Sequence, residues 1–288
     1  MKIQTPRRIV CLSIGLILIC SCGGGKRTGL TNATSQISQD LTSGHFQKPL
    51  DKCQVEYQKD PKDAGILEQY LKAIKHIKVS ADKAFEREDF VLAGSTYALL
   101  LKNFPQFAPF ANKLSFDANY LTLKIRVSRT RVVERQGQLY LKAGNHQKAI
   151  DLYRELHQQY SQDLVVQNSC TSFMKLIKAN ADLAFEKNDL VLAGNTYRIL
   201  LRNFGAFNFI GRFLPYDREL LNINIKECQR KLFENGLEQY RSGNLSLAIS
   251  IWKSILTFDP ENSEVKKAVD TAILQSRNLK RNEVSDVK

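Results

Sequence analysis

Two sets of charged residues recur one hundred residues apart and are the first candidates for chemistry. In each set an aspartate and a glutamate lie four residues apart, and paired carboxylates can act as a general acid and a general base. A lysine also stands four residues before each aspartate, which is the spacing of ion pairs along one helix face. We therefore interpret both sets as helix faces rather than catalytic sites. The residues are Lys78, Asp82 and Glu86, then Lys178, Asp182 and Glu186.

The histidines and cysteines form no recognisable metal or nucleophile motif. The histidines contain no HxxxH or HExxH pattern, the chain after residue 22 contains no CxxC, and no GxSxG or phosphate loop is present. His146 stands at an expected turn between two helices, where we expect a solvated side chain. The sequence therefore predicts no catalytic residue, no metal and no cofactor, and hence no enzyme. The four histidines are His45, His76, His146 and His157.

The elements that must position these residues are written twice. Residues 77–107 align without gaps to residues 177–207, and residues 137–153 resemble residues 236–252 at an offset of 99. A unit of about 100 residues therefore occurs twice, which indicates a repeat architecture. Some aligned positions differ between the copies, and these are better places than the shared ones to look for what each half binds. The differences are Ala98 against Arg198 and Pro105 against Gly205.

Each unit contains two smaller units with a common spacing. Gly236 is followed by Ala248 after twelve residues, by Trp252 after four more and by Pro260 after eight more. This pattern resembles the tetratricopeptide repeat (TPR), a pair of antiparallel helices in about 34 residues. The resemblance implies that the small residue and the alanine lie where the two helices cross, and that the aromatic side chain fills the space between hairpins.

The resemblance implies an all-α, right-handed solenoid of about five hairpins over residues 41–288. The first hairpin is degenerate, with Pro49 in the alanine place and Cys53 in the aromatic place. Unit starts lie 44 to 56 residues apart, so we expect elongated helices, including long ones near 117–143 and 217–242. The C-terminal segment is expected to form an amphipathic capping helix. The expected units are 30–63, 74–107, 130–163, 174–207 and 229–262.

The first residues resemble the signal peptide of a bacterial lipoprotein. Residues 1–21 combine a basic start with a short apolar run, and Ile19, Cys20 and Ser21 precede Cys22 as in a lipobox. The resemblance implies a covalent lipid on Cys22 and a flexible tether over residues 22–40, whereas an uncleaved N-terminal anchor is the alternative. Glycines rather than an aspartate follow Cys22, which implies the outer membrane, facing the periplasm.

The chain is strongly basic, with 42 Lys and Arg against 29 Asp and Glu. Removing residues 1–21 takes away three basic residues and no acidic one, so the net charge falls from +13 to +10. This charge favours an acidic partner, and export argues against nucleic acid. The remaining cysteines could form one disulfide and a thiol, or three buried thiols, which is our preferred interpretation. They are Cys53, Cys170 and Cys228.

Members of the TPR family bind peptides in a concave groove lined by the first helix of each hairpin. Mapping the groove positions onto this chain gives mostly basic residues, which indicates either a groove for an acidic or carboxylate-bearing ligand or plain solubilising charge. The expected partner-binding residues are Lys75, Lys78, Arg131, Arg135, Lys175, Lys178, Arg230 and Phe233.

Three phenylalanines follow the second helix of each copy. They form either a packed corner, which we favour, or an exposed patch. They are Phe104, Phe107, Phe110, Phe204, Phe207 and Phe209.

Three functions are compatible with this sequence. The leading expectation is a non-catalytic protein-interaction scaffold, anchored to the bacterial outer membrane and assisting an envelope, pilus or secretion complex. The alternative is an envelope protein that binds a polyanion, such as cell wall or lipopolysaccharide, through its basic surface. A hidden enzyme or enzyme regulator is the third, and it would have to use Asp82 and Asp182.

Overall fold

The computed structural model describes residues 37–285, and the chain divides into two compact units, Met1–Ala73 and Ile74–Lys288. The predicted signal peptide, Cys22 and most of the predicted tether lie outside the described residues. In the first unit, α2 (Gln47–Lys59) carries Pro49 in its first turn, where the missing N–H costs nothing. Tyr57 packs against the buried Tyr70 with ring centroids 6.2 Å apart. The boundary between the units falls within α3 (Ala64–Glu86).

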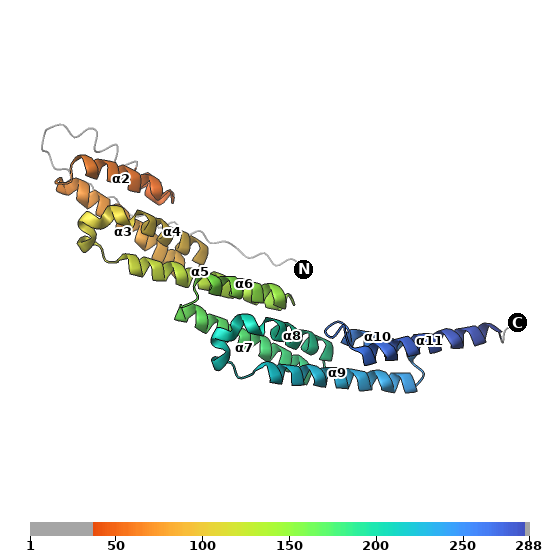
Figure 1. The fold of residues 1–288 in the computed structure, drawn as a ribbon. Helices are drawn as coiled ribbons and strands as arrows, with labels where there is room; N and C mark the ends of the chain where they lie inside the picture. The colour runs from red at the N-terminus through yellow and green to blue at the C-terminus, as the bar shows by residue number, and fades with distance from the viewer. Residues whose placement is uncertain (1–36, 286–288) are drawn as a thin grey trace. The chain divides into compact units, whose positions relative to one another are not determined.

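The second unit is a series of antiparallel helical hairpins (Figure 1). Consecutive helices from α4 to α11 contact one another, and the described residues contain no strand. The fold is therefore an all-α solenoid, which confirms the fold class expected from the sequence. Its elements after α3 are α4 (Phe90–Asn103), η1 (Phe104–Lys113), α5 (Ala118–Lys142), α6 (His146–Gln159), α7 (Leu164–Glu186), α8 (Leu190–Asn203), η2 (Phe204–Phe213), α9 (Arg218–Arg241), α10 (Leu245–Ile255) and α11 (Ser263–Ser285).

The duplication seen in the sequence is also a duplication of structure. The elements α7, α8, η2 and α9 repeat the bounds of α3, α4, η1 and α5 at an offset of 100 residues, except that α9 ends one residue earlier, and α10 begins 99 residues after α6. The helix α11 lies at an offset of 99 from α7, so it corresponds to the first helix of a further copy. The final helix packs on α10, as expected for a cap.

The turns inside the four hairpins have the same backbone. Each has one residue at positive φ directly before the N-cap residue of the second helix, and the φ values lie between 61° and 81°. Two of the caps are aspartates, since Asp89 accepts a hydrogen bond from the N–H of Leu92 and Asp189 accepts one from the N–H of Leu192. The positive-φ residues are Glu88, Gly144, Asn188 and Gly243.

In two hairpins the small residue at the helix crossing meets the aromatic side chain of the same hairpin, whereas the resemblance had placed that side chain between hairpins. A Cβ added to Gly137 would lie 2.7 Å from the ring of Tyr153, and one added to Gly236 would lie 2.3 Å from the ring of Trp252. Alanine is therefore too large at both small-residue positions of these hairpins. The alanines at the helix crossings of the four units after the degenerate first one are fully buried: Ala81, Ala93, Ala149, Ala181, Ala193 and Ala248.

The phenylalanine corner is packed rather than exposed. Phe107, Phe110 and Phe207 are each at most 1% exposed, in the two segments of 3-10 helix that follow α4 and α8. Phe104 lies edge-on to Phe107, with ring centroids 6.0 Å apart. This confirms the interpretation of these residues as core. The two 3-10 segments lead into α5 and α9.

The three cysteines of the described chain are buried thiols. Burial raises the pKa of Cys53 to about 11 and those of Cys170 and Cys228 to about 12. These thiols are therefore protonated side chains of the core at neutral pH.

No helix in residues 37–285 combines the length and the apolar character needed to cross a bilayer.

Candidate functional site

In each copy the repeated aspartate links the first two helices, because it binds a tyrosine of the second helix and a lysine of its own helix. We call this set of three residues a clip. On α3, Asp82 accepts a 2.6 Å hydrogen bond from the hydroxyl of Tyr97 on α4 and lies 2.7 Å from the ammonium of Lys78. On α7, Asp182 accepts a 2.6 Å hydrogen bond from Tyr197 and a 2.7 Å one from Lys178. The i, i+4 ion pairs expected from the sequence are thus present in both copies.

The electrostatics of the first clip favour a permanently charged pair. The hydrogen bond to Asp82 raises the pKa of Lys78. Burial alone would raise the pKa of Asp82, but the hydrogen bonds from Lys78 and Tyr97 outweigh it and hold that pKa below its usual value. Burial and the bond to Asp82 raise the pKa of Tyr97, so its hydroxyl remains a donor. The geometry is that of a structural link between helices.

The clip predicts a pH dependence of stability that one substitution removes. Because the pKa of Asp82 is lower in the folded chain, its contribution is complete at neutral pH and is lost as the pH falls below about 4, the usual range of aspartate. We expect Asp82→Asn to melt earlier than the wild type at pH 7 and the two melting temperatures to converge towards pH 3. Thermal melts across this range measure it, and two parallel curves would contradict the assignment.

Two of the predicted binding cations are held by these clips. Lys78 and Lys178 are only partly exposed, and each also lies over a tyrosine ring, at 5.3 Å from Tyr120 and 5.6 Å from Tyr197. A carboxylate ligand would have to displace an aspartate that is already bound. These two lysines therefore serve the hairpins in this structure.

The other predicted binding residues divide into paired and unpaired groups. Arg131 pairs with Glu134 at 2.8 Å, and Arg230 bridges two glutamates of its own helix. Phe233 packs on Trp252 with ring centroids 5.7 Å apart. Among the predicted binding residues, Lys75, Arg135 and Lys175 are exposed and make no ion pair within residues 37–285.

His146 was expected to be a solvated turn residue, and this expectation is wrong. It is the first residue of α6, its exposure is only 9%, and burial lowers its pKa. The side chain therefore belongs to the packed end of the hairpin. In the part of the chain that the structure describes, no group of three His, Cys, Asp or Glu side chains could hold a metal ion.

The clearest difference between the two copies is a groove beside the second helix. In the second copy it is filled by the chain itself, because Phe258 follows α10 and its ring lies against Gly194 of α8. A Cβ on Gly194 would come within 2.7 Å of the ring, and Phe258 is 1% exposed. Glycine at this position therefore makes the space that the ring occupies.

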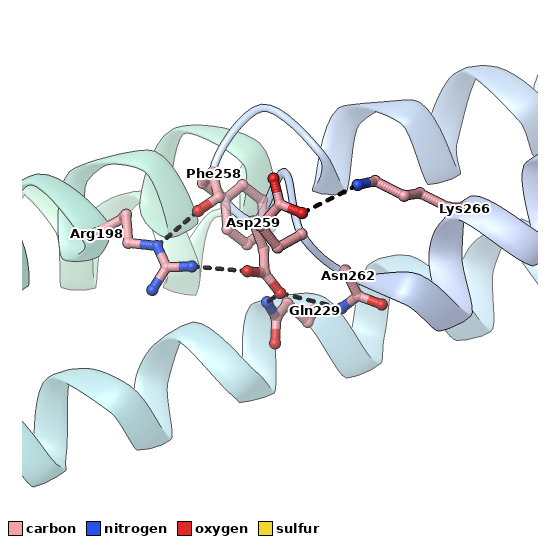
Figure 2. Close-up of polar contacts among 7 residues, drawn as sticks. Arg198, Gln229, Phe258, Asp259, Asn262 and Lys266 are labelled. Atoms are coloured by element: carbon pink, nitrogen blue, oxygen red, sulfur yellow. Dashed lines mark hydrogen bonds and ion pairs between the residues drawn. The ribbon is translucent and has the colours of Figure 1, made fainter.

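Polar contacts hold Phe258 and Asp259 in the second groove, and we call these two residues the plug (Figure 2). Arg198 on α8 donates to the backbone carbonyl of Phe258 and to the carboxylate of Asp259, both at 2.7 Å. Gln229 on α9 donates to the other oxygen of Asp259 at 2.6 Å, and Asn262 donates to it at 3.1 Å. The pair Phe258–Asp259 is thus bound through a ring, a carbonyl and a carboxylate at once.

In the first copy the same groove is open. The residue that corresponds to Phe258 is Gln159, and the one that corresponds to Arg198 is Ala98. A cavity of about 400 Å³ remains between α4, α5 and α6, within the range of roughly 300–1,000 Å³ typical of ligand clefts. Its lining is mostly apolar and includes Val91, whose exposure is 68%. Arg129 and Glu155 supply charge at this cavity.

Sequence reasoning pointed to one member of this site and missed the rest. It singled out the difference between Ala98 and Arg198, which is the difference that leaves the first groove without its arginine. It gave no role to Phe258 and Asp259, which fill the second groove. The signal that could have found them is the lack of a phenylalanine at position 159 when the copies are aligned at the offset of 99.

Comparisons with known proteins add little to this geometry. No profile of a known protein family matches the chain, and no curated protein matches its sequence. A solved structure described as a "Circular tandem repeat protein with novel repeat topology and enhanced subunit contact surfaces" is similar over 90% of this chain and 66% of that one, with 13% identity and a TM-score of 0.23. This chain thus spans slightly less than two thirds of that protein. The fold assigned above rests on the helices and their contacts alone.

Proposed function

We propose that this chain is a TPR-like, non-catalytic scaffold that binds a protein partner. The observation that carries the proposal is the open groove of the first copy, because the same groove in the second copy binds a segment of polypeptide. A fold that already uses this surface for one stretch of chain has the shape to accept another. Asp82 and Asp182, two of the carboxylates considered for catalysis, are engaged in the helix clips.

Charge supports a partner with an acidic surface. Lys75, Arg135 and Lys175 are exposed and carry no ion pair among the described residues, and the whole chain has a net charge of +13. Such a surface speeds association with an acidic partner, and high salt weakens that association. A partner that binds through charge alone would be a polyanion rather than a protein.

We further propose that a lipid on Cys22 holds the scaffold at the outer membrane, facing the periplasm. The support is the order of basic, apolar and small residues before Cys22. Cys22→Ala should abolish incorporation of labelled palmitate, because it removes the thiol that would carry the lipid. Palmitate labelling of the wild type and the variant measures this, and a variant that still incorporates palmitate would contradict the anchor.

Site-specific photocrosslinking in the native envelope tests the scaffold. A photoreactive residue at Val91 lies at the open groove, and the same residue at Val191 lies beside the filled one as a matched control. We expect one discrete protein adduct from position 91 and none from position 191. Adducts confined to lipopolysaccharide or cell wall, or equal adducts from both positions, would overturn the proposal.

A further inference from the structure

We propose that the groove between α4, α5 and α6 receives a partner segment in which a phenylalanine is followed by an acidic residue. This inference rests on the proposed scaffold function and names the chemistry of its partner. The argument comes from the second copy, where Phe258 and Asp259 of the chain itself occupy the corresponding groove.

The floor of the groove is alike in both copies. Gly94 on α4 corresponds to Gly194 and lines the cavity, where a Cβ added to it would lie 3.2 Å from Ser128 of α5. Ile125 on α5 corresponds to Ile225, and Leu156 on α6 corresponds to Ile255. The surface that receives the ring of Phe258 is therefore kept in the first copy.

The ring itself is what the first copy lacks. Gln159 stands where Phe258 stands, and its carbonyl is turned towards Arg129, with a distance of 3.5 Å from Nη1 to Oε1. Val91 is consequently 68% exposed, whereas its counterpart Val191 is partly buried. An aromatic side chain entering the cavity would bury Val91 and the neighbouring apolar wall. Burial of apolar surface of this kind stabilises a complex by about 25 cal/mol per Å².

The charge at the groove selects the residue after the ring. Arg129 takes the place of Gln229, which donates to the carboxylate of Asp259 in the second copy. At present Arg129 donates to the hydroxyl of Tyr160 at 2.7 Å and to Gln159, both of which are neutral. A guanidinium has five N–H donors, so it can accept a carboxylate in addition. Glu155 lies one turn before Gln159, and its negative charge disfavours a second acidic residue in the part of the partner segment that lies beside it.

A peptide copied from the plug is the direct probe. The fluorescein-labelled nonapeptide SILTFDPEN has the sequence of residues 254–262. We expect saturable binding to the full chain in fluorescence anisotropy, and binding at least about tenfold weaker for the peptide with Phe258→Ala, because buried aromatic anchors dominate such interfaces. Equal binding of the two peptides would overturn the proposal.

Two protein variants locate the binding in the open groove. Gln159→Phe lets the first copy fill its own groove and should weaken peptide binding at least about tenfold, while circular dichroism reports whether it folds. Arg129→Ala should weaken binding of the wild-type peptide but not of the peptide with Asp259→Asn, which lacks the carboxylate directly after the phenylalanine. If both folded variants bind the peptide like the wild type, the groove is not its site and the proposal is wrong.

Other occupants give distinct results. If the chain dimerises and Gln159→Phe makes it monomeric in sedimentation, a second copy fills the groove and the proposal is wrong. If the peptide does not bind but position 91 still crosslinks to a discrete protein, the phenylalanine–acid segment is wrong and the scaffold stands. If neither the peptide nor a crosslinked protein is found, the proposed function fails as well.

Discussion

Phe258→Ala should destabilise the second copy by about 3–5 kcal/mol, the range for large-to-small substitution of a buried aromatic residue. The ring is 1% exposed and packs directly on Gly194, which has no side chain with which to fill the void. The plug also positions Asp259, whose carboxylate receives hydrogen bonds from Arg198 and Gln229. Urea denaturation measures the loss in the free energy of unfolding.

The effect should be concentrated at the C-terminal end. Neighbouring hairpins of a solenoid stabilise one another through their shared interfaces, so α10 and α11 depend most directly on the plug. Amide hydrogen exchange in Phe258→Ala should accelerate in these two helices more than in α4 and α5. The matched control is Gln159→Ala, which changes the corresponding residue of the first copy. It should alter stability by about 0.5 kcal/mol or less, because Gln159 is exposed. Equal losses in both variants would contradict the asymmetry of the two grooves.

The sequence predicted what is local and periodic. Helix crossings depend on residues within one hairpin, so the buried positions of Ala193 and Ala248 could be predicted from spacing. The same holds for the ion pair of Lys78 with Asp82, which lies within one helix. Periodicity at 100 residues also fixed which elements recur.

The sequence could not show what depends on contacts between distant segments. Arg198 binds Asp259, which lies 61 positions away in a connection whose repeat pattern marks only Pro260. The repeat register identifies neither partner as a contact. Lys78 and Lys178 were placed in the binding groove by register alone, whereas the tyrosines that cover them come from other helices. The open groove is therefore a feature of tertiary structure, and it is recognised by comparing the two folded copies.

Gly236→Ala should destabilise the last hairpin, although alanine is the better helix former. Intrinsic propensity alone would stabilise α9 by about 1 kcal/mol, since glycine is the poorer residue inside a helix. The added Cβ, however, would lie 2.3 Å from Nε1 of Trp252, a ring that is 2% exposed and cannot rotate away without moving the core. Displacing it also lengthens the 3.1 Å hydrogen bond from Nε1 to the carbonyl of Phe233. Overpacking of a core costs about 1–3 kcal/mol and a hydrogen bond about 1 kcal/mol, so the net loss should be about 1–3 kcal/mol.

Two other glycines test whether the clash decides the sign for Gly236→Ala. Gly137→Ala should also destabilise, because its Cβ would lie 2.7 Å from the ring of Tyr153. Gly205→Ala should be neutral or slightly stabilising, since nothing lies within 4 Å of its Cβ and the corresponding residue of the first copy is Pro105. Chemical denaturation of the three variants, with Trp252 fluorescence reporting the last hairpin, gives the comparison. A stabilised Gly236→Ala would mean that helix propensity outweighs the contact with Trp252, and the small residue would then have no packing role at the crossing.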